Sequence, residues 1–138
     1  MTTTTAQWIF DKAMALMDEL AESTGIALYS DTREYHNRTL PILNTIRHEC
    51  YLASDTWQTT EPGRRPIVAE ITDFDSVIDI DDGVAQGAMP YGLAALLMLG
   101  ENDTLADYFS QRYLELLAQL RNGIPASWES IPLAYGGV

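Results

Sequence analysis

The sequence is poor in cysteine and in basic residues, and it lacks a long apolar run. Its single cysteine, Cys50, excludes an intramolecular disulfide, so we expect a cytosolic protein or one indifferent to redox state. Eight lysines and arginines accompany twenty aspartates and glutamates, and this net charge of −12 argues against tight binding of nucleic acid, a polyanion. No apolar run reaches the roughly 18 residues that span a bilayer. The start "MTTTTAQW" also lacks the features of a signal peptide, so we expect no membrane association.

Signatures of catalysis and of cofactor binding are also missing. There is no G-x-S-x-G and no P-loop, and the glycines of "GVAQGAMPYG" do not follow a buried strand as a dinucleotide fingerprint requires. The "HEC" at 48–50 is not the HExxH zinc pattern, because no second histidine follows at the right spacing. His36 and His48 are therefore interpreted as surface or boundary residues, and Cys50 as a buried thiol. We expect no cofactor, no metal and no enzymatic activity.

The most acidic stretch, "DFDSVIDIDDG" at 73–83, raises the question of a calcium loop. An EF-hand loop needs oxygen ligands at positions 1, 3 and 5, glycine at 6 and an acid at 12. With Gly83 at position 6, Ile78 and Ile80 occupy positions 1 and 3, and Met89 occupies position 12. The ligand spacing therefore fails.

The same stretch fits an extended lead-in to a helix. Asp81 or Asp82 then accepts hydrogen bonds from the free amides of the helix and faces the positive end of its dipole. A cation shared between subunits is the less favoured alternative.

Hydrophobic periodicity predicts an all-α single domain, a bundle of four main helices. The predicted helices cover residues 5–22, 32–52, 82–100 and 103–121. Pro41 predicts a kink or a late start in the second helix, and Pro90 predicts a kink in the third. The second half of the third helix is apolar nearly all round, which is typical of a central helix.

Three segments lie outside these helices: a flexible N-terminus at 1–4, a long loop at 54–79 and an extended C-terminal arm at 123–138. Apolar and basic residues in the loop and the arm predict a protein interface, since exposed aromatic residues anchor such surfaces. The candidates are Trp57, Arg64, Arg65 and Ile67 in the loop, and Trp128, Ile131, Leu133 and Tyr135 in the arm. Two alternatives stay open: each tryptophan could pack on its own domain, and the arginine pair could be a solvated turn.

Residues 79–120, "DIDDGVAQGAMPYGLAALLMLGENDTLADYFSQRYLELLAQL", resemble the C-terminal half of head–tail connector (adaptor) proteins of tailed phages. The shared feature is an acid-capped helix, an Ala/Leu-rich run ending near "GEND", and an amphipathic helix. The stretches "IFDKAMALMDELAESTG" and "YHNRTLPILNTIRHECY" resemble the matching N-terminal half in prophages of Gram-positive hosts. The resemblance covers most of residues 8–121, and no catalytic-grade motif carries it.

The resemblance implies a structural virion protein of the neck, assembled in the cytoplasm of a bacterial host. Connectors of this kind are small α-helical bundles that form a ring, typically of twelve copies, beneath the portal protein and carry the tail terminator or stopper protein. DNA passes through the lumen without specific binding, and an acidic lumen would avoid trapping that polyanion. The family's contact surfaces are not defined by motif residues, so no binding residue is implied for this chain.

Two rival functions belong to other classes. A small acidic interaction module, such as an inhibitor that mimics DNA, would need its acids on one face, whereas here they are spread through every segment. A small helical enzyme or metal protein is disfavoured by the failed motifs.

Overall fold

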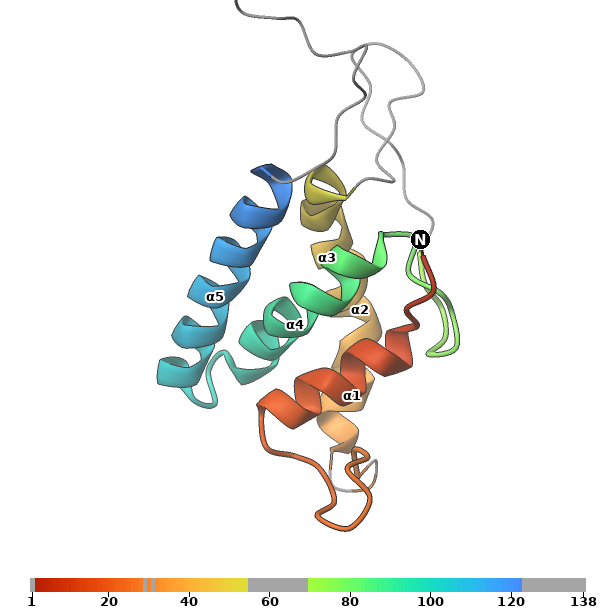
Figure 1. Ribbon diagram of the computed structural model, residues 1–138. Helices are drawn as coiled ribbons and strands as arrows, with labels where there is room; N and C mark the ends of the chain where they lie inside the picture. Colours follow the sequence, from red (N-terminus) through yellow and green to blue (C-terminus); the bar gives the residue numbers. More distant parts are fainter. Residues whose placement is uncertain (1, 29, 31, 55–69, 123–138) are drawn as a thin grey trace, which may run out of the picture.

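The computed structural model describes residues 2–28, 30, 32–54 and 70–122, and this part of the chain is all-α (Figure 1). The elements are α1 (Ala6–Leu16), α2 (Arg33–Cys50), the 3-10 helix η1 (Tyr51–Ala53), α3 (Asp82–Gly87), α4 (Met89–Met98) and α5 (Asp103–Asn122). The described residues form no strand, only two isolated antiparallel bridges, Thr5 to Val77 and Leu20 to Ala27. The predicted all-α class is confirmed.

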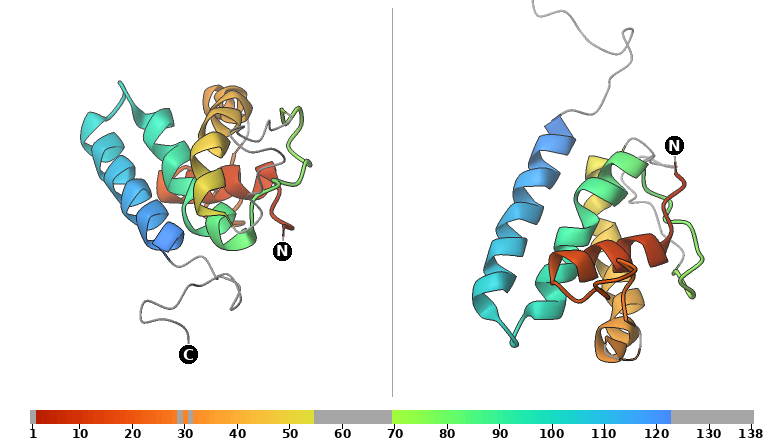
Figure 2. Two further views of the ribbon diagram at one scale, coloured as in Figure 1. Left: turned by 90° about the horizontal axis from the view of Figure 1, so that it is seen from above. Right: turned by 60° about the horizontal axis from the view of Figure 1, so that its bottom comes forward.

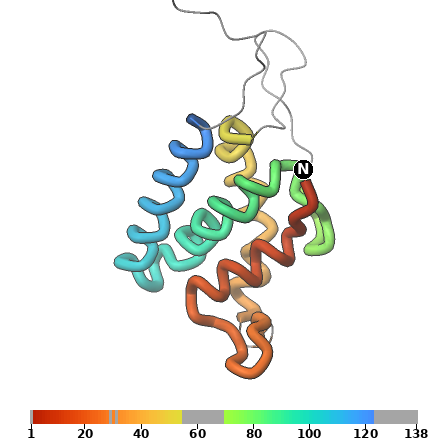
Figure 3. The backbone as a smooth tube through the Cα atoms, viewed as in Figure 1, coloured from red at the N-terminus to blue at the C-terminus, as the bar shows by residue number. Residues whose placement is uncertain are grey.

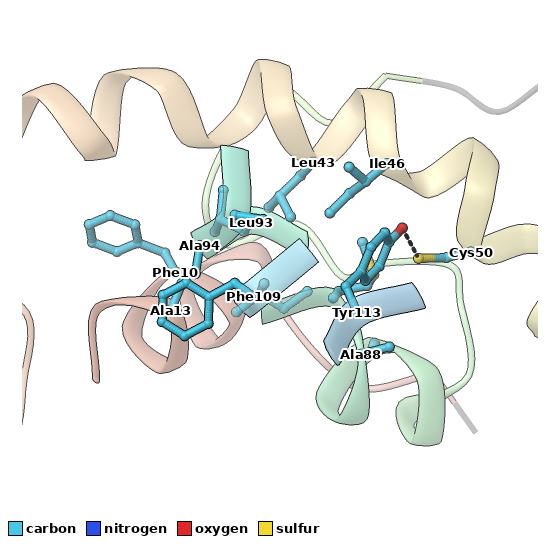
Figure 4. Close-up of a cluster of buried hydrophobic side chains, with 14 of the residues drawn as sticks. Phe10, Ala13, Leu43, Ile46, Cys50, Ala88, Leu93, Ala94, Phe109 and Tyr113 are labelled. Carbon is cyan, nitrogen blue, oxygen red and sulfur yellow. Dashed lines mark hydrogen bonds between the residues drawn. The ribbon is translucent and has the colours of Figure 1, made fainter. Parts of the chain in front are cut away.

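Helix α4 lies at the centre of the described fold and packs against α1, α2 and α5. Leu93 and Ala94 are fully buried in α4, as is most of the helix, because an apolar surface on every side must be covered by neighbours. Figure 4 shows their neighbours in the core, which include Phe10 of α1, Leu43 of α2 and Phe109 of α5. The predicted central position of this segment is therefore confirmed.

The predicted helix at 82–100 consists of two helices. Helix α3 ends at Gly87, and α4 begins at Met89 after Ala88, whose φ of −117° lies outside the helical range. Pro90 occupies the first turn of α4, where its missing N–H has no intrahelical partner to lose. Proline therefore divides this segment, where the sequence predicted a kinked but continuous helix.

Helix α1 is shorter than the predicted helix at 5–22. It ends at Leu16, and Asp18 takes a left-handed φ of 63° that a continuing helix does not allow. The chain then reverses through Gly25, whose φ is 68°, so that Leu20 forms its bridge with Ala27. Figure 3 shows this excursion between α1 and α2. The apolar residues after Leu16 pack onto the core from a turn, which periodicity does not distinguish from a helix.

Helix α2 begins at Arg33 and includes Pro41, so the predicted alternative of a late start is wrong. The carbonyl oxygen of Pro41 accepts a hydrogen bond from Thr45 Oγ1 at 3.0 Å. Immediately after Cys50 the chain continues into η1, which brings Leu52 next to the last turns of α5.

Candidate functional site

The described part of the chain contains two of the sequence-predicted site residues, Asp81 and Asp82. The loop candidates Trp57, Arg64, Arg65 and Ile67 and the arm candidates Trp128, Ile131, Leu133 and Tyr135 lie outside the described residues. The loop follows η1 and the arm follows α5, and both elements belong to the described surface.

Asp81 is the N-cap of α3. Its Oδ1 accepts a hydrogen bond from the amide of Val84 at 3.1 Å, which satisfies a free donor of the first turn. Its own amide donates to Ser54 Oγ at 3.1 Å. Ile78 and Ile80 just before it are fully buried. The capping interpretation is confirmed for Asp81.

Asp82 has a different role, which the sequence did not indicate. Its Oδ1 accepts from the amides of Thr3 and Thr4 at 2.8 and 3.0 Å and from Thr4 Oγ1 at 2.7 Å, while its Oδ2 accepts from Thr3 Oγ1 at 2.7 Å. Thr4 is buried, with 3% of its surface exposed. One carboxylate thus binds four donors of Thr3 and Thr4.

The segment before α3 pairs with the N-terminal residues beyond this carboxylate. Ile78 donates its amide to the carbonyl oxygen of Thr4 at 2.8 Å, and Ala6 donates its amide to that of Ser76 at 3.1 Å. Figure 2 shows the N-terminus beside this segment in two views. The acidic stretch thus holds the start of the chain against the start of α3.

The hydrogen bonds from Thr3 and Thr4 lower the pKa of Asp82 to about 2, from an ordinary value of 3.8. Because the pKa is lowered in the folded state, the ionised carboxylate stabilises the fold fully above pH 3.8, and this contribution is lost as the pH falls towards 2. Asp82→Asn should therefore reduce the free energy of unfolding most above pH 4, and its difference from the wild type should shrink between pH 4 and 2. Urea unfolding across this pH range, followed by circular dichroism, measures the difference.

The control variant is Asp107→Asn, which removes an exposed carboxylate from α5. It should leave the free energy of unfolding at pH 7 within about 0.5 kcal/mol of the wild type. A gap between Asp82→Asn and the wild type that stays constant from pH 5 to pH 2 would contradict the assigned role.

A second polar cluster joins the acidic stretch to α2. Arg47 is 4% exposed, and its Nη2 lies 2.6 Å from Asp79 Oδ1, while the hydroxyl of Tyr51 donates to Asp79 Oδ2 at 2.6 Å. Burial alone would raise the pKa of Asp79, but the hydrogen bonds from Tyr51 and Arg47 outweigh it and keep that pKa below its usual value. Burial and the bond to Asp79 raise the pKa of Tyr51 to about 12. These groups hold the end of α2 and the acidic stretch together.

His36 and Cys50 have structural surroundings. His36 stacks on Phe74, with ring centroids 3.9 Å apart, and meets the edge of Phe10 at 5.1 Å. Burial lowers the pKa of His36, against an opposing effect of Asp11. Cys50 is fully buried, as predicted, and burial raises its pKa to about 12. Among the described residues, no group of three or more His, Cys, Asp or Glu is arranged to hold a metal ion.

One apolar groove lies between the first half of α2 and the end of α4. We call it the α2/α4 groove; it has a volume of about 400 Å³ and is lined by Asn37, Arg38, Pro41, Ile42, Leu96 and Leu99. Leu99 is 62% exposed. The guanidinium of Arg38 donates to the carbonyl oxygen of Leu96 at 3.1 Å, so it satisfies a free acceptor at the end of α4 and leaves the groove floor apolar.

A second groove lies at the other end of α2, between η1 and the last turns of α5. We call it the η1/α5 groove; its volume is about 370 Å³, and it is lined by Glu49, Leu52, Leu114, Leu117, Ala118 and Arg121. Leu52 and Leu114 are 49% and 57% exposed. Sequence reasoning did not single out either leucine. Leu114 directly follows Tyr113, which faces the core, so Leu114 lies outside the apolar face of α5. A leucine outside the apolar face of a helix is the sequence feature that could have indicated this groove.

No helix of the described chain is long and apolar enough to cross a membrane. The chain matches no family model, no curated protein and no solved structure at a significant level.

Proposed function

We propose that this protein is a head-to-tail connector of a tailed phage, a non-enzymatic adaptor that forms a ring beneath the portal protein. The observation that carries the proposal is a pair of unlike apolar grooves, one beside the first half of α2 and one beside its end, on a domain whose described polar clusters serve its own packing. A ring with cyclic symmetry needs two different surfaces on each subunit, so that one surface of each subunit binds an unlike surface of the next. The resemblance of residues 79–120 to connectors supports the same function.

Exposed leucines support an interface role for both grooves. Leu99 is 62% exposed and Leu114 57% exposed, and each belongs to a groove with other apolar side chains. A leucine gains roughly 1.5–3 kcal/mol when it passes from full exposure to full burial, so two such surfaces favour association. Single exposed leucines are common, and it is their clustering in grooves that favours an interface here.

The charge of the protein supports a ring through which DNA passes. Exposed carboxylates occur on α2, on α5 and in the acidic stretch, for example Glu34, Asp75 and Asp107. With a net charge of −12, such surfaces repel a passing polyanion. Their spread over several elements does not favour the rival function of a DNA mimic, which requires one acidic face. The proposed partners are further copies of this chain, the portal protein and a tail terminator or stopper protein, and the proposed location is the virion neck.

The test of this function is the mass and shape of the full chain in solution. We expect sedimentation velocity and negative-stain images to show closed rings whose population grows with protein concentration. Leu99→Glu should abolish the rings, because it places a charge in the α2/α4 groove. Deleting residues 124–138 should also prevent ring formation, since the arm is one of the proposed contact segments.

The matched control is Thr104→Glu, which adds the same charge at an exposed position outside both grooves. It should assemble as the wild type does. A wild-type chain that remains monomeric at its highest soluble concentration, or rings that form equally well with Leu99→Glu and with the deletion, would contradict the proposal.

A further inference from the structure

The η1/α5 groove is an apolar surface at the point where the C-terminal arm begins. Arg121 lines the groove, and α5 ends one residue later at Asn122 (Figure 1). The last turns of α5 lie beside η1, so Leu52 and Leu114 face a shared space from two elements. The sixteen residues that follow Asn122 therefore start at the edge of this groove.

The composition of the arm matches the groove. Residues 123–138, "GIPASWESIPLAYGGV", contain one charged side chain, Glu129, and five large apolar or aromatic ones. Those five are Ile124, Trp128, Ile131, Leu133 and Tyr135. Exposure of this arm to water is unfavourable, because its apolar side chains would remain hydrated. The floor of the groove, formed by leucine and alanine, is a complementary surface.

Chain geometry decides which residue of the arm reaches which part of the groove. From Asn122 back to Leu114 is eight residues of helix, or about 12 Å at 1.5 Å per residue. If the chain reverses at Gly123 and Ile124, the four extended residues from there to Trp128 cover about 13 Å. Trp128 then lies level with Leu114. The "NGIP" sequence at 122–125 suits such a reversal, because glycine is the usual residue just past a helix and proline follows it commonly.

We propose that, in the isolated subunit, the C-terminal arm folds back antiparallel to α5 and places the indole of Trp128 in the η1/α5 groove against Leu52 and Leu114. Glu49 at the rim offers an acceptor for the indole N–H, which a buried tryptophan usually requires. The connection is intramolecular, so the arm is present at its groove at a millimolar effective concentration. The inference does not depend on ring formation, and arms exchanged between neighbours in a ring would use the same groove.

A disulfide trap tests this register. In the double variant Ala118→Cys with Ala126→Cys, the two new thiols lie opposite each other if Trp128 is level with Leu114, and both changes replace a small side chain. The native thiol Cys50 does not interfere, since it is fully buried. On mild oxidation of the dilute full chain, we expect an intrachain disulfide, seen as a monomer of increased gel mobility that reduction reverses.

The matched control is Gln119→Cys with Ala126→Cys, because Gln119 is exposed and does not line the groove. It should cross-link several-fold more slowly. Adding Leu114→Lys to the first pair should slow its cross-linking to the control rate, while far-UV circular dichroism shows that the domain remains folded.

Two results would overturn the proposal. Interchain disulfides as the main product in dilute solution would show that the groove receives the arm of a second copy. Equal cross-linking of the Ala118 and Gln119 pairs would show that the arm does not occupy the groove. Either result concerns the isolated subunit and can be obtained whether or not rings form, so a failure here is distinguishable from a failure of the connector function.

Discussion

Gly92→Ala should destabilise the protein by about 1–2 kcal/mol, although alanine is the better helix former. A Cβ at Gly92 would lie 2.8 Å from Cε1 and 3.0 Å from Cδ1 of Tyr113, closer than real Cβ contacts allow. The helix-propensity gain is roughly 0.5–1 kcal/mol, whereas overpacking a core costs about 1–3 kcal/mol, so the steric effect wins. Urea unfolding monitored by far-UV circular dichroism measures the difference.

The ring of Tyr113 cannot move away easily. Tyr113 is 5% exposed, and its hydroxyl lies 3.4 Å from Cys50 Sγ, a hydrogen bond that joins α5 to α2 (Figure 4). Moving the ring to admit a methyl group would break this bond and disturb the packing between α4 and α5. Gly92 therefore permits a close approach of α4 and α5.

The matched control is Gly87→Ala at the end of α3. A Cβ there meets nothing within 4 Å, and the residue is helical, so the substitution should be neutral or stabilising by up to about 1 kcal/mol. If the two alanine variants are equally stable, the contact with Tyr113 does not limit the packing of α4 on α5.

Asp79→Asn should cost about 1.5–3 kcal/mol, the range for hydrogen bonds to charged groups. The substitution keeps the size of the side chain but leaves the guanidinium of Arg47, which is 4% exposed, without the carboxylate at 2.6 Å. Arg47 keeps its hydrogen bond to Asn44 Oδ1 at 3.1 Å, but a buried guanidinium that loses a carboxylate loses part of the compensation for its desolvation. The free energy of unfolding from urea titration is again the measurement.

Replacing the arginine of this ion pair should reduce the free energy of unfolding by less. In Arg47→Met the buried position becomes apolar, while the carboxylate of Asp79 is 51% exposed and remains hydrated. The double variant Asp79→Asn with Arg47→Met should therefore be more stable than the sum of the single effects predicts, with a coupling energy of about 1–3 kcal/mol.

Asp75→Asn provides the control on the same segment. Asp75 is exposed, so the change should stay within about 0.5 kcal/mol of the wild type. A larger loss in Arg47→Met than in Asp79→Asn, or effects that simply add, would mean that the ion pair does not hold the acidic stretch to α2.

Local sequence determined which segments of the described chain become helical. The apolar positions of α2 and α5 repeat every three to four residues, and their predicted bounds agree with the structure to within about two residues, the usual uncertainty of helix ends. The apolar composition of α4 predicted its central position, and Asp81 predicted a cap. These features follow from contacts between residues close in the chain or from the exclusion of apolar surface from water. The sequence of each segment alone is therefore enough to predict them.

The tertiary structure decided what depends on partners far apart in the chain. Asp82 binds Thr3 across 79 residues, Arg47 binds Asp79 across 32, and α1 stops at Leu16 because the following residues pack in a turn around the Leu20–Ala27 bridge. The η1/α5 groove forms only where η1 packs beside the end of α5, and neither segment forms a groove on its own. No local pattern encodes such pairings, since their free energy arises only when folding brings distant residues into contact.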